Sequence, residues 1–223
     1  MSVTAIVPIK ERSERVPGKN FRDLGGVPLY RHILTTLEQC ALVTSILVDT
    51  DSRDLSESLS REHPNVSVRM RRPELGSSSA SMDEVLREAV PCVDSEFVIQ
   101  LHVTNPLLRS ETIDRALELY ISEERFGTLI SADLILGRLW TEDSKPVNHD
   151  PCVMERTQDM RPVFKENSCF FVFRRDEMVK TGVRCISPVS FFSVSGIESV
   201  DIDTEEDFQL ASVLYSAGYG ALM

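Results

Sequence analysis

Residues 3–20 read VTAIVPIKERSERVPGKN, and the fold that we expect follows from them. The apolar run at its start predicts a first β-strand, because it is short, apolar and bounded by a charged loop. Four cations follow within that loop: Lys10, Arg12, Arg15 and Lys19. In an open α/β sheet, ligands bind at the carboxyl ends of strands. The loop therefore predicts a phosphate-binding segment, although a plain solvated loop has a similar composition.

The size and charge of the chain restrict the possible functions. Its 223 residues suit one domain, and a net charge of −11 argues against general binding to nucleic acids or anionic membranes. No apolar stretch approaches the roughly 18 residues of a membrane span, and the N-terminal residues lack the pattern of a signal peptide. The five cysteines have no CxxC spacing, which favours free thiols in a reducing cytoplasm.

Short apolar runs alternate with helical periodicity along most of the chain. We expect strands at residues 3–8, 45–49, 66–70, 97–101, 128–132 and 169–173. We expect helices at residues 29–39, 53–62, 81–90, 110–123 and about 205–215, with Ser110 as an N-cap. This order predicts an α/β fold: a Rossmann-like, mostly parallel sheet with helices on both faces.

Residues 134–166 break this alternation. The segment, which we call the excursion, contains Pro146, Pro151 and Pro162 and has no helical or strand period. Structureless loops of this length are uncommon inside compact domains. We therefore expect a single domain over residues 1–223 with a small irregular excursion, serving as a lid, a substrate loop or a dimerisation arm.

The common nucleotide-binding motifs are absent, since neither GxxxxGK[ST] nor GxGxxG occurs. Residues 8–20 instead resemble the N-terminal signature of the CMP-sialic acid synthetase family, the acylneuraminate cytidylyltransferases, which are related to the CMP-Kdo synthetases. That signature runs P-x-R-x-x-S-x-x-x-P-x-K-N and is followed by L-x-G-x-P-L. The chain supplies Pro8, Lys10, Ser13, Pro17, Lys19, Asn20, Leu24, Gly26, Pro28 and Leu29. The family arginine falls on Lys10, so its role rests with Lys10, with Arg12 or with both.

Further matches follow in the same order along the chain. Residues 72–75 (RPEL), with the small residues after them, resemble the family's R-P-x-x-L segment before a helix. Residues 102–107 (HVTNPL) resemble Q-P-T-S-P-L, with His102 in place of glutamine. Residues 166–168 (ENS) resemble an E-N-G turn before a strand, and residues 201–208 resemble the closing D-I-D-T-x-x-D-F.

The resemblance implies a dimeric Rossmann-like enzyme that uses CTP and Mg²⁺. It gives catalytic, charge-neutralising roles to Lys10, Arg12, Arg15 and Lys19. It places Ser13, Asn20, Arg72, Ser79, Ala80, Ser81, His102 and Thr104 beside the nucleotide. For His102 we expect contact with the substrate or the nucleotide rather than acid–base chemistry.

Two acidic pairs are candidate metal ligands. In an extended strand Asp201 and Asp203 would point to the same face, and two like charges there favour a bound cation such as Mg²⁺. Alternatively, Asp203 or Thr204 caps the last helix. For the rival pair, Asp49 and Asp51, we expect helix capping.

For several other polar and aromatic residues, the sequence predicts a less specific role. His149 either contacts substrate or supports the excursion, and Arg156, Gln158 and Arg161 are expected to be solvated charges or polar groups. Trp140 and the Phe170–Phe171 pair are expected in the core or in a dimer interface.

The function we expect is transfer of CMP from CTP to an acidic sugar, a nonulosonic acid such as N-acetylneuraminate. A Kdo-like sugar, a phosphonate or a polyol phosphate is an alternative acceptor. A non-catalytic nucleotide-binding protein would share the fold. A glycosyltransferase would need a mid-chain DxD motif, and residues 49–51 come early for one. The expected partners are CTP, an acidic small molecule and a second copy of the chain, with no nucleic acid and no membrane.

Overall fold

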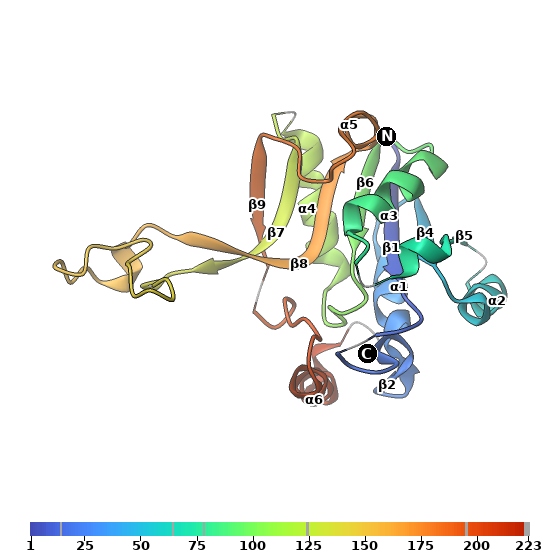
Figure 1. Cartoon of the computed structure of the whole chain (residues 1–223), viewed down its shortest axis with the longest axis horizontal. Helices are drawn as coiled ribbons and strands as arrows, with labels where there is room; N and C mark the ends of the chain where they lie inside the picture. The colour runs from blue at the N-terminus through green and yellow to red at the C-terminus, as the bar shows by residue number, and fades with distance from the viewer. Residues whose placement is uncertain (14, 64, 78, 124, 195, 221–223) are drawn as a thin grey trace.

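The central element of the structure, a computed structural model, is one β-sheet (Figure 1). The structure describes residues 1–13, 15–63, 65–77, 79–123, 125–194 and 196–220. Within these residues the sheet has seven strands in the order β5-β4-β1-β6-β8-β7-β9. They are β1 (Val3–Ile9), β4 (Ser45–Thr50), β5 (Val66–Met70), β6 (Phe97–Leu101), β7 (Thr128–Ile135), β8 (Val163–Arg174) and β9 (Val189–Ser193). A small hairpin of β2 (Asp23–Leu24) and β3 (Val27–Pro28) lies apart from it.

The sheet is mostly parallel, as the sequence predicts. Strand β1 pairs in parallel with β4 and β6, β4 with β5, and β7 with β9. Among the described strands of the seven-stranded sheet, only β8 runs against both of its neighbours, pairing antiparallel with β6 and β7. The helices are α1 (Leu29–Gln39), α2 (Arg53–Glu62), α3 (Met82–Ala89), α4 (Ser110–Ser122), α5 (Arg175–Thr181) and α6 (Glu205–Leu214).

Helices cover both faces of the sheet, and the alternation of side chains along β1 shows how. Val3, Ala5 and Val7 pack with α1, α2 and α4 on one face, whereas Ile6 packs with α3 and α5 on the other. Because neighbouring residues of a strand point to opposite faces, a fully apolar strand is buried on both.

In the described part of the chain, no helix combines the length and apolar character needed to cross a membrane.

Most predicted elements are present, and several local predictions are wrong. Ser110 is the first residue of α4 rather than its cap, because the extended residue before it, Arg109, donates its N–H to Glu198 at 3.1 Å. The extended strand expected to carry Asp201 and Asp203 is not formed; the N–H of Ile202, between them, donates to the carbonyl of Thr104 at 2.9 Å. Ser52, not the rival acidic pair, caps α2.

The excursion is more regular at its base than its sequence predicts. Strand β7 runs on to Ile135 and pairs with β8 from Val163, so both ends of the segment form a two-stranded stem. Figure 1 shows this stem carrying the rest of the excursion away from the sheet as a projecting arm. The pairing is non-local and joins residues about 30 positions apart, which explains why the sequence period does not reveal it.

Residues 166–168 lie inside β8 instead of forming a turn before it. The register between β7 and β8 shifts between Ile130 and Ala132, and Ser168 has φ of 57°. A bulge with one residue in the left-handed region explains why a glycine suits this position in the family pattern.

Candidate active site

A cavity of about 800 Å³ lies at the carboxyl ends of β1 and β6. Its walls come from the loop after β1, the segment between β5 and α3, the start of α3 and the residues after β6. The lining residues are Pro8, Lys10, Arg12, Ser13, Arg15, Lys19, Asn20, Arg71, Gly76, Ser77, Ala80, Met82, Val85, His102, Val103 and Thr104. The cavity therefore lies at the edge of the sheet where α/β folds bind ligands.

The fold brings most of the predicted site residues to this cavity, but five of them are not among its described lining residues: Arg72, Ser79, Ser81, Asp201 and Asp203. Arg72, Ser79 and Ser81 are exposed and are not among the described lining residues. The side chain of Arg72 forms an ion pair with Glu88. Ser81 caps α3 in a capping box with Glu84. Both side chains thus have structural partners that hold them outside the cavity.

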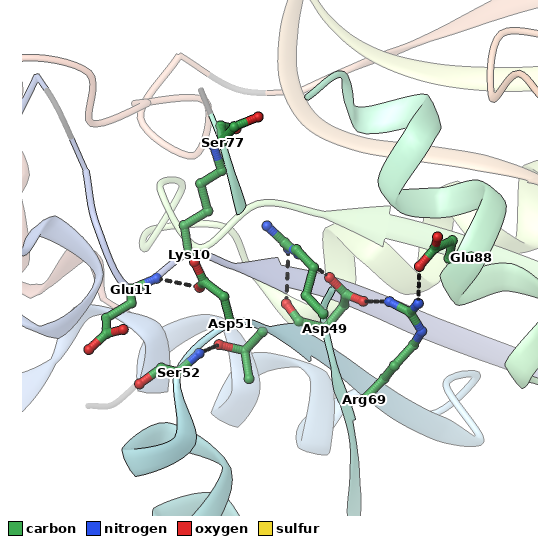
Figure 2. Close-up of polar contacts among 10 residues, drawn as sticks. Lys10, Glu11, Asp49, Asp51, Ser52, Arg69, Ser77 and Glu88 are labelled. Atoms are coloured by element: carbon green, nitrogen blue, oxygen red, sulfur yellow. Dashed lines mark hydrogen bonds and ion pairs between the residues drawn. The ribbon is translucent and has the colours of Figure 1, made fainter. Parts of the chain in front are cut away.

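Hydrogen bonds fix the cationic loop to its surroundings (Figure 2). The ammonium of Lys10 donates to the carbonyl of Ser77 at 2.7 Å, which joins the two walls of the cavity. The N–H of Glu11 donates to Asp51 at 2.8 Å. The amide of Asn20 donates to the carbonyl of Lys10 at 2.8 Å and closes the base of the loop. The loop is thus held by contacts with Ser77 and Asp51 and by one hydrogen bond within itself.

These contacts distinguish Lys10 from Arg12. The ammonium of Lys10 has a carbonyl partner on the opposite wall. The side chain of Arg12 is exposed, lines the cavity and has no ion pair with any residue that the structure describes. Arg12 is therefore the freer of the two cations to meet a ligand phosphate.

Lys19 is the buried cation of the loop, with 7% of its surface exposed. Its ammonium contacts the carbonyl of Ile202 and lies 3.6 Å from Oδ1 of Asp203. Burial lowers the pKa of Lys19, and the charges of Asp203 and Asp201 oppose this effect. Gly18, at φ of 64°, makes the left-handed turn that leads into Lys19.

The two acidic residues near the C-terminus contact this cationic wall. Asp203 forms an ion pair with Arg15 at 2.8 Å. Thr204, in a capping box with Asp207, caps α6, so Asp203 is not used as the cap. Burial raises the pKa of Asp201 in spite of a hydrogen bond with Thr104. Its Oδ1 atom is buried without a hydrogen-bond partner among the described residues.

These carboxylates fit the requirements of Mg²⁺, although they are not on a strand. Mg²⁺ keeps several waters and usually takes one or two carboxylates together with substrate phosphates. Asp201 supplies a buried oxygen without a partner, and Asp203 lies two residues on. Among the described residues, no group of three or more histidine, cysteine or acidic side chains is arranged to hold a metal. An ion here would therefore depend on ligand oxygens.

Arg71 lines the cavity at the position where the sequence pattern suggests Arg72. It is buried because both it and Arg69 bind the carboxylate of Asp49, which has no exposed surface (Figure 2 shows the pairing of Asp49 with Arg69). Arg69 also pairs with Glu88. Asp49 is therefore neither a helix cap nor an evident metal ligand, because two guanidinium groups already occupy its oxygens.

His102 follows β6 and lines the cavity, as expected. Burial lowers the pKa of His102 from 6.5 to about 4, and the positive charges of Arg184 and Lys19 add to this effect. The imidazole is therefore neutral at physiological pH and can both donate and accept a hydrogen bond.

The structure also places the residues of the excursion and the Phe170–Phe171 pair. His149 packs edge-on against Trp140 within the excursion, with ring centroids 4.6 Å apart, as a residue that supports the loop would. Arg156 is exposed and pairs with Asp159. Phe170 and Phe171 are core residues.

The arrangement combines a cationic loop and a buried lysine at one cavity with a carboxylate, Asp203, that contacts both. Comparison with known proteins identifies the family. The family model described as cytidylyltransferase matches residues 4–178. The chain is 27% identical to the N-acylneuraminate cytidylyltransferase of Streptococcus agalactiae, over 93% of this chain and 52% of that protein. It thus spans about half the length of this and several other curated relatives.

A second relative has the same length range as this chain. The CMP-N,N'-diacetyllegionaminic acid synthase of Legionella pneumophila is 25% identical, with all of both chains covered. Among solved structures, that of CMP:2-keto-3-deoxy-manno-octonic acid synthetase complexed with CTP has a TM-score of 0.74 at 16% identity, covering 97% of this chain and 99% of that chain. The structural likeness shows the fold, and the match of the family model over most of the sequence shows that this chain belongs to the cytidylyltransferase family.

Proposed function

We propose that this chain transfers CMP from CTP to an acidic sugar of the nonulosonic acid class and releases pyrophosphate. The observation that carries the proposal is the gathering of Lys10, Arg12, Arg15 and Lys19 on one cavity wall of a chain with net charge −11. Concentrated positive charge at the carboxyl end of β1 suits a triphosphate. The sequence relatives named for nonulosonic acids support the acceptor class.

In this reaction the anomeric hydroxyl oxygen of the sugar attacks the α-phosphorus of CTP. The bond from this phosphorus to the bridging oxygen breaks, and the electron pair leaves with pyrophosphate. Catalysis of such transfers is mostly positioning and charge neutralisation. Arg12 and Arg15, exposed along the cavity, are suited to the outer phosphates. Lys19, held by Ile202 and Asp203, is suited to a fixed position near the reacting phosphorus.

Mg²⁺ is the expected cofactor, and Asp201 and Asp203 are the residues that would hold it. When bound, the ion would neutralise phosphate charge and lower the pKa of a hydroxyl that it contacts. Arg15 pairs with Asp203 and lines the cavity, so its guanidinium can exchange a carboxylate partner for a phosphate. Burial raises the pKa of Asp201, and a cation bound beside this carboxylate would oppose that effect.

We also propose that two copies of the chain associate through the excursion. Large apolar side chains are exposed along it: Leu136, Trp140, Val147, Val153, Met154 and Phe164. Exposed apolar groups gathered on a projecting arm favour burial against another surface. Light scattering should give a dimer for the wild type and a monomer for Met154→Glu with Trp140→Glu, whereas Val179→Glu on α5 should remain dimeric. A monomeric wild type would contradict this proposal.

Five unpaired cysteines favour a cytoplasmic setting.

The test of the proposed function is pyrophosphate release from each of four nucleoside triphosphates, with Mg²⁺ and a panel of acids. The panel contains N-acetylneuraminate, N,N'-diacetyllegionaminate and Kdo. Release with CTP and a nonulosonic acid is the expected result. A preference for ATP, or no release with CTP and any acid, would exclude the proposal. Release with Kdo alone would instead move the chain to the alternative acceptor class.

A further inference from the structure

Arg22, which is not among the described residues that line the cavity, joins the segment that carries Lys19 to the segment that carries Asp203. Its guanidinium donates two parallel hydrogen bonds to the carboxylate of Glu205, from Nη1 to Oε2 at 2.6 Å and from Nη2 to Oε1 at 2.9 Å. The same guanidinium stacks over the ring of Phe208, 3.9 Å from its centroid. We call this contact of Arg22 with Glu205 and Phe208 the clasp.

Each end of the clasp is a few residues from a charged group of the proposed site. The N–H of Arg22 donates to the carbonyl of Lys19 at 3.2 Å and closes the short 3₁₀ turn that begins with that lysine. On the other side, Glu205 is the first residue of α6 and follows Asp203 by two positions. The N–H of Asp203 donates to Asp207 in the first turn of α6 at 3.0 Å. A shift of this turn relative to Arg22 would therefore move the carboxylate of Asp203 relative to the ammonium of Lys19.

The far end of α6 has an attachment of its own. Tyr215 follows the helix, and Gly25 lies so close to its ring that a Cβ at Gly25 would be 2.0 Å from a ring carbon. The ring also lies edge-on to His32, with centroids 4.9 Å apart. Figure 1 shows α6 and β2 at the same end of the molecule. Without the clasp, α6 would thus stay attached at its end while its first turn lost a directed contact.

The other contacts beneath α6 are apolar. A small cluster, separate from the two larger ones, contains Leu24, Leu29, Ile202, Phe208 and Ala211. Apolar burial is non-directional, whereas an arginine fork on a carboxylate fixes direction as well as distance. The distance of 3.6 Å between Lys19 and Asp203 therefore depends on the clasp.

The clasp is too exposed to contribute much to stability. The side chains of Arg22 and Glu205 are 34% and 52% exposed, and exposed ion pairs contribute little to the free energy of unfolding. A matched control exists elsewhere in the described part of the chain. Arg31 of α1 pairs with Glu62 of α2, at side-chain exposures of 32% and 39%. Neither helix supplies a described residue of the cavity lining.

We propose that Arg22 is a positioning residue, which through the clasp holds Lys19 and Asp203 at the separation that CMP transfer requires. The proposal rests on the proposed function, because it concerns the same site and the same reaction. Loss of Arg22 should lower kcat and leave the KM for CTP near its wild-type value. The reason is that the loop around Lys10 is held by Ser77 and Asp51 instead of the clasp.

Steady-state kinetics with CTP and the best acid of the panel test this proposal. Arg22→Gln should lower kcat by about 10- to 100-fold, the scale for a small displacement of a positioned group. The KM for CTP should stay within about twofold of the wild type, since the lost interaction acts on the reacting state. Arg22→Lys keeps the charge but not the fork, and should recover part of the lost kcat.

Two further variants show whether the pair acts as a unit. Glu205→Gln breaks the same contact from the other side, so it should give the same loss of kcat and serves alone if Arg22→Gln does not fold. The double variant should be no slower than either single variant. The control Arg31→Gln should keep the wild-type kcat. Losses that add in the double variant, or an equal kcat in Arg22→Gln and Arg31→Gln, would overturn the proposal.

Hydrogen exchange followed by mass spectrometry tests the clasp directly and needs no acceptor. Peptides that cover residues 19–24 and 202–207 should exchange faster in Arg22→Gln than in the wild type, whereas peptides from α1 should not change. Unchanged exchange in the first two peptides would overturn the proposal even where kcat falls.

Failure of the proposal and failure of the proposed function give different results. If acids are turned over and Arg22→Gln keeps the wild-type kcat, positioning by Arg22 is excluded and the proposed function stands. If no acid is turned over, the proposed function fails, and exchange alone decides. Faster exchange in both peptides then supports the clasp as the contact that holds the two segments together, and unchanged exchange overturns it.

Discussion

Substitution of His102 by glutamine tests the electrostatics of the cavity wall. The pKa of His102 is about 4 in the folded chain and 6.5 in the unfolded chain, chiefly because of burial and secondarily because of Arg184 and Lys19. Between these two pH values, His102 binds a proton in the unfolded state but not in the folded state. The free energy of unfolding therefore falls as the pH is lowered from 6.5 towards 4, and above 6.5 this residue contributes no pH dependence.

The size of this change in unfolding free energy follows from the shift in the pKa of His102. The difference between a pKa of 6.5 and one of about 4 corresponds to at most about 3.4 kcal/mol of unfolding free energy. About 2.5 kcal/mol of it is developed at pH 4.5. Because the ring keeps some exposed surface and water screens part of the charge, we expect about 1–2.5 kcal/mol.

The assay is urea unfolding of the wild type and His102→Gln at pH 7.5 and pH 4.5. The difference in unfolding free energy between the two proteins should shift by that amount in favour of the variant at the lower pH. Burial also lowers the pKa of His32, but His32 is present in both proteins and its effect cancels. An unchanged difference at the two pH values would refute the reasoning, since it would mean that His102 titrates normally.

Three further predictions follow from the same contacts. Lys19→Met should lower kcat by about 10²- to 10³-fold in steady-state assays with CTP, because it removes a fixed cation from the site; a far-UV circular dichroism spectrum like that of the wild type would show that the fold is kept, and unchanged kcat would remove Lys19 from catalysis. Asp49→Asn should lower the free energy of unfolding by about 3–5 kcal/mol in urea, because it leaves two arginines without their buried carboxylate; a change below about 1 kcal/mol would contradict that account. Chelation with EDTA should abolish turnover, and Asp201→Asn should raise the Mg²⁺ concentration required for half-maximal activity; turnover that persists in EDTA would exclude the metal.

The sequence predicts much of the fold because its signals are local. The apolar run of β1, and the periodicity of α1 and α2, are properties of short segments, and their boundaries agree closely with the structure. The start of α4 differs because Glu198, nearly 90 residues away, binds the N–H of Arg109. The stem of the excursion differs for the same reason, since strand pairing between distant residues leaves no period in the sequence.

The candidate site shows the same division between local and distant signals. The cationic loop is continuous in sequence, and its side chains reach the cavity together. Arg71 was missed because the family pattern points to its neighbour, Arg72. One signal could have found it: Arg69 and Arg71 alternate on one face at the end of β5, beside the acidic Asp49 of β4. Arg22 has no such signal, because only the folded chain brings it to Glu205 and Phe208.

Transfer of CMP to an acidic sugar can be followed with two forms of radioactive CTP. With ³²P in the α-phosphate, the account predicts that label passes into a product that also contains the sugar, in amounts equal to the pyrophosphate formed. With ³²P in the γ-phosphate, label should appear in pyrophosphate alone. Label from the γ-phosphate in the sugar product, or release of free CMP without an acceptor, would contradict the account.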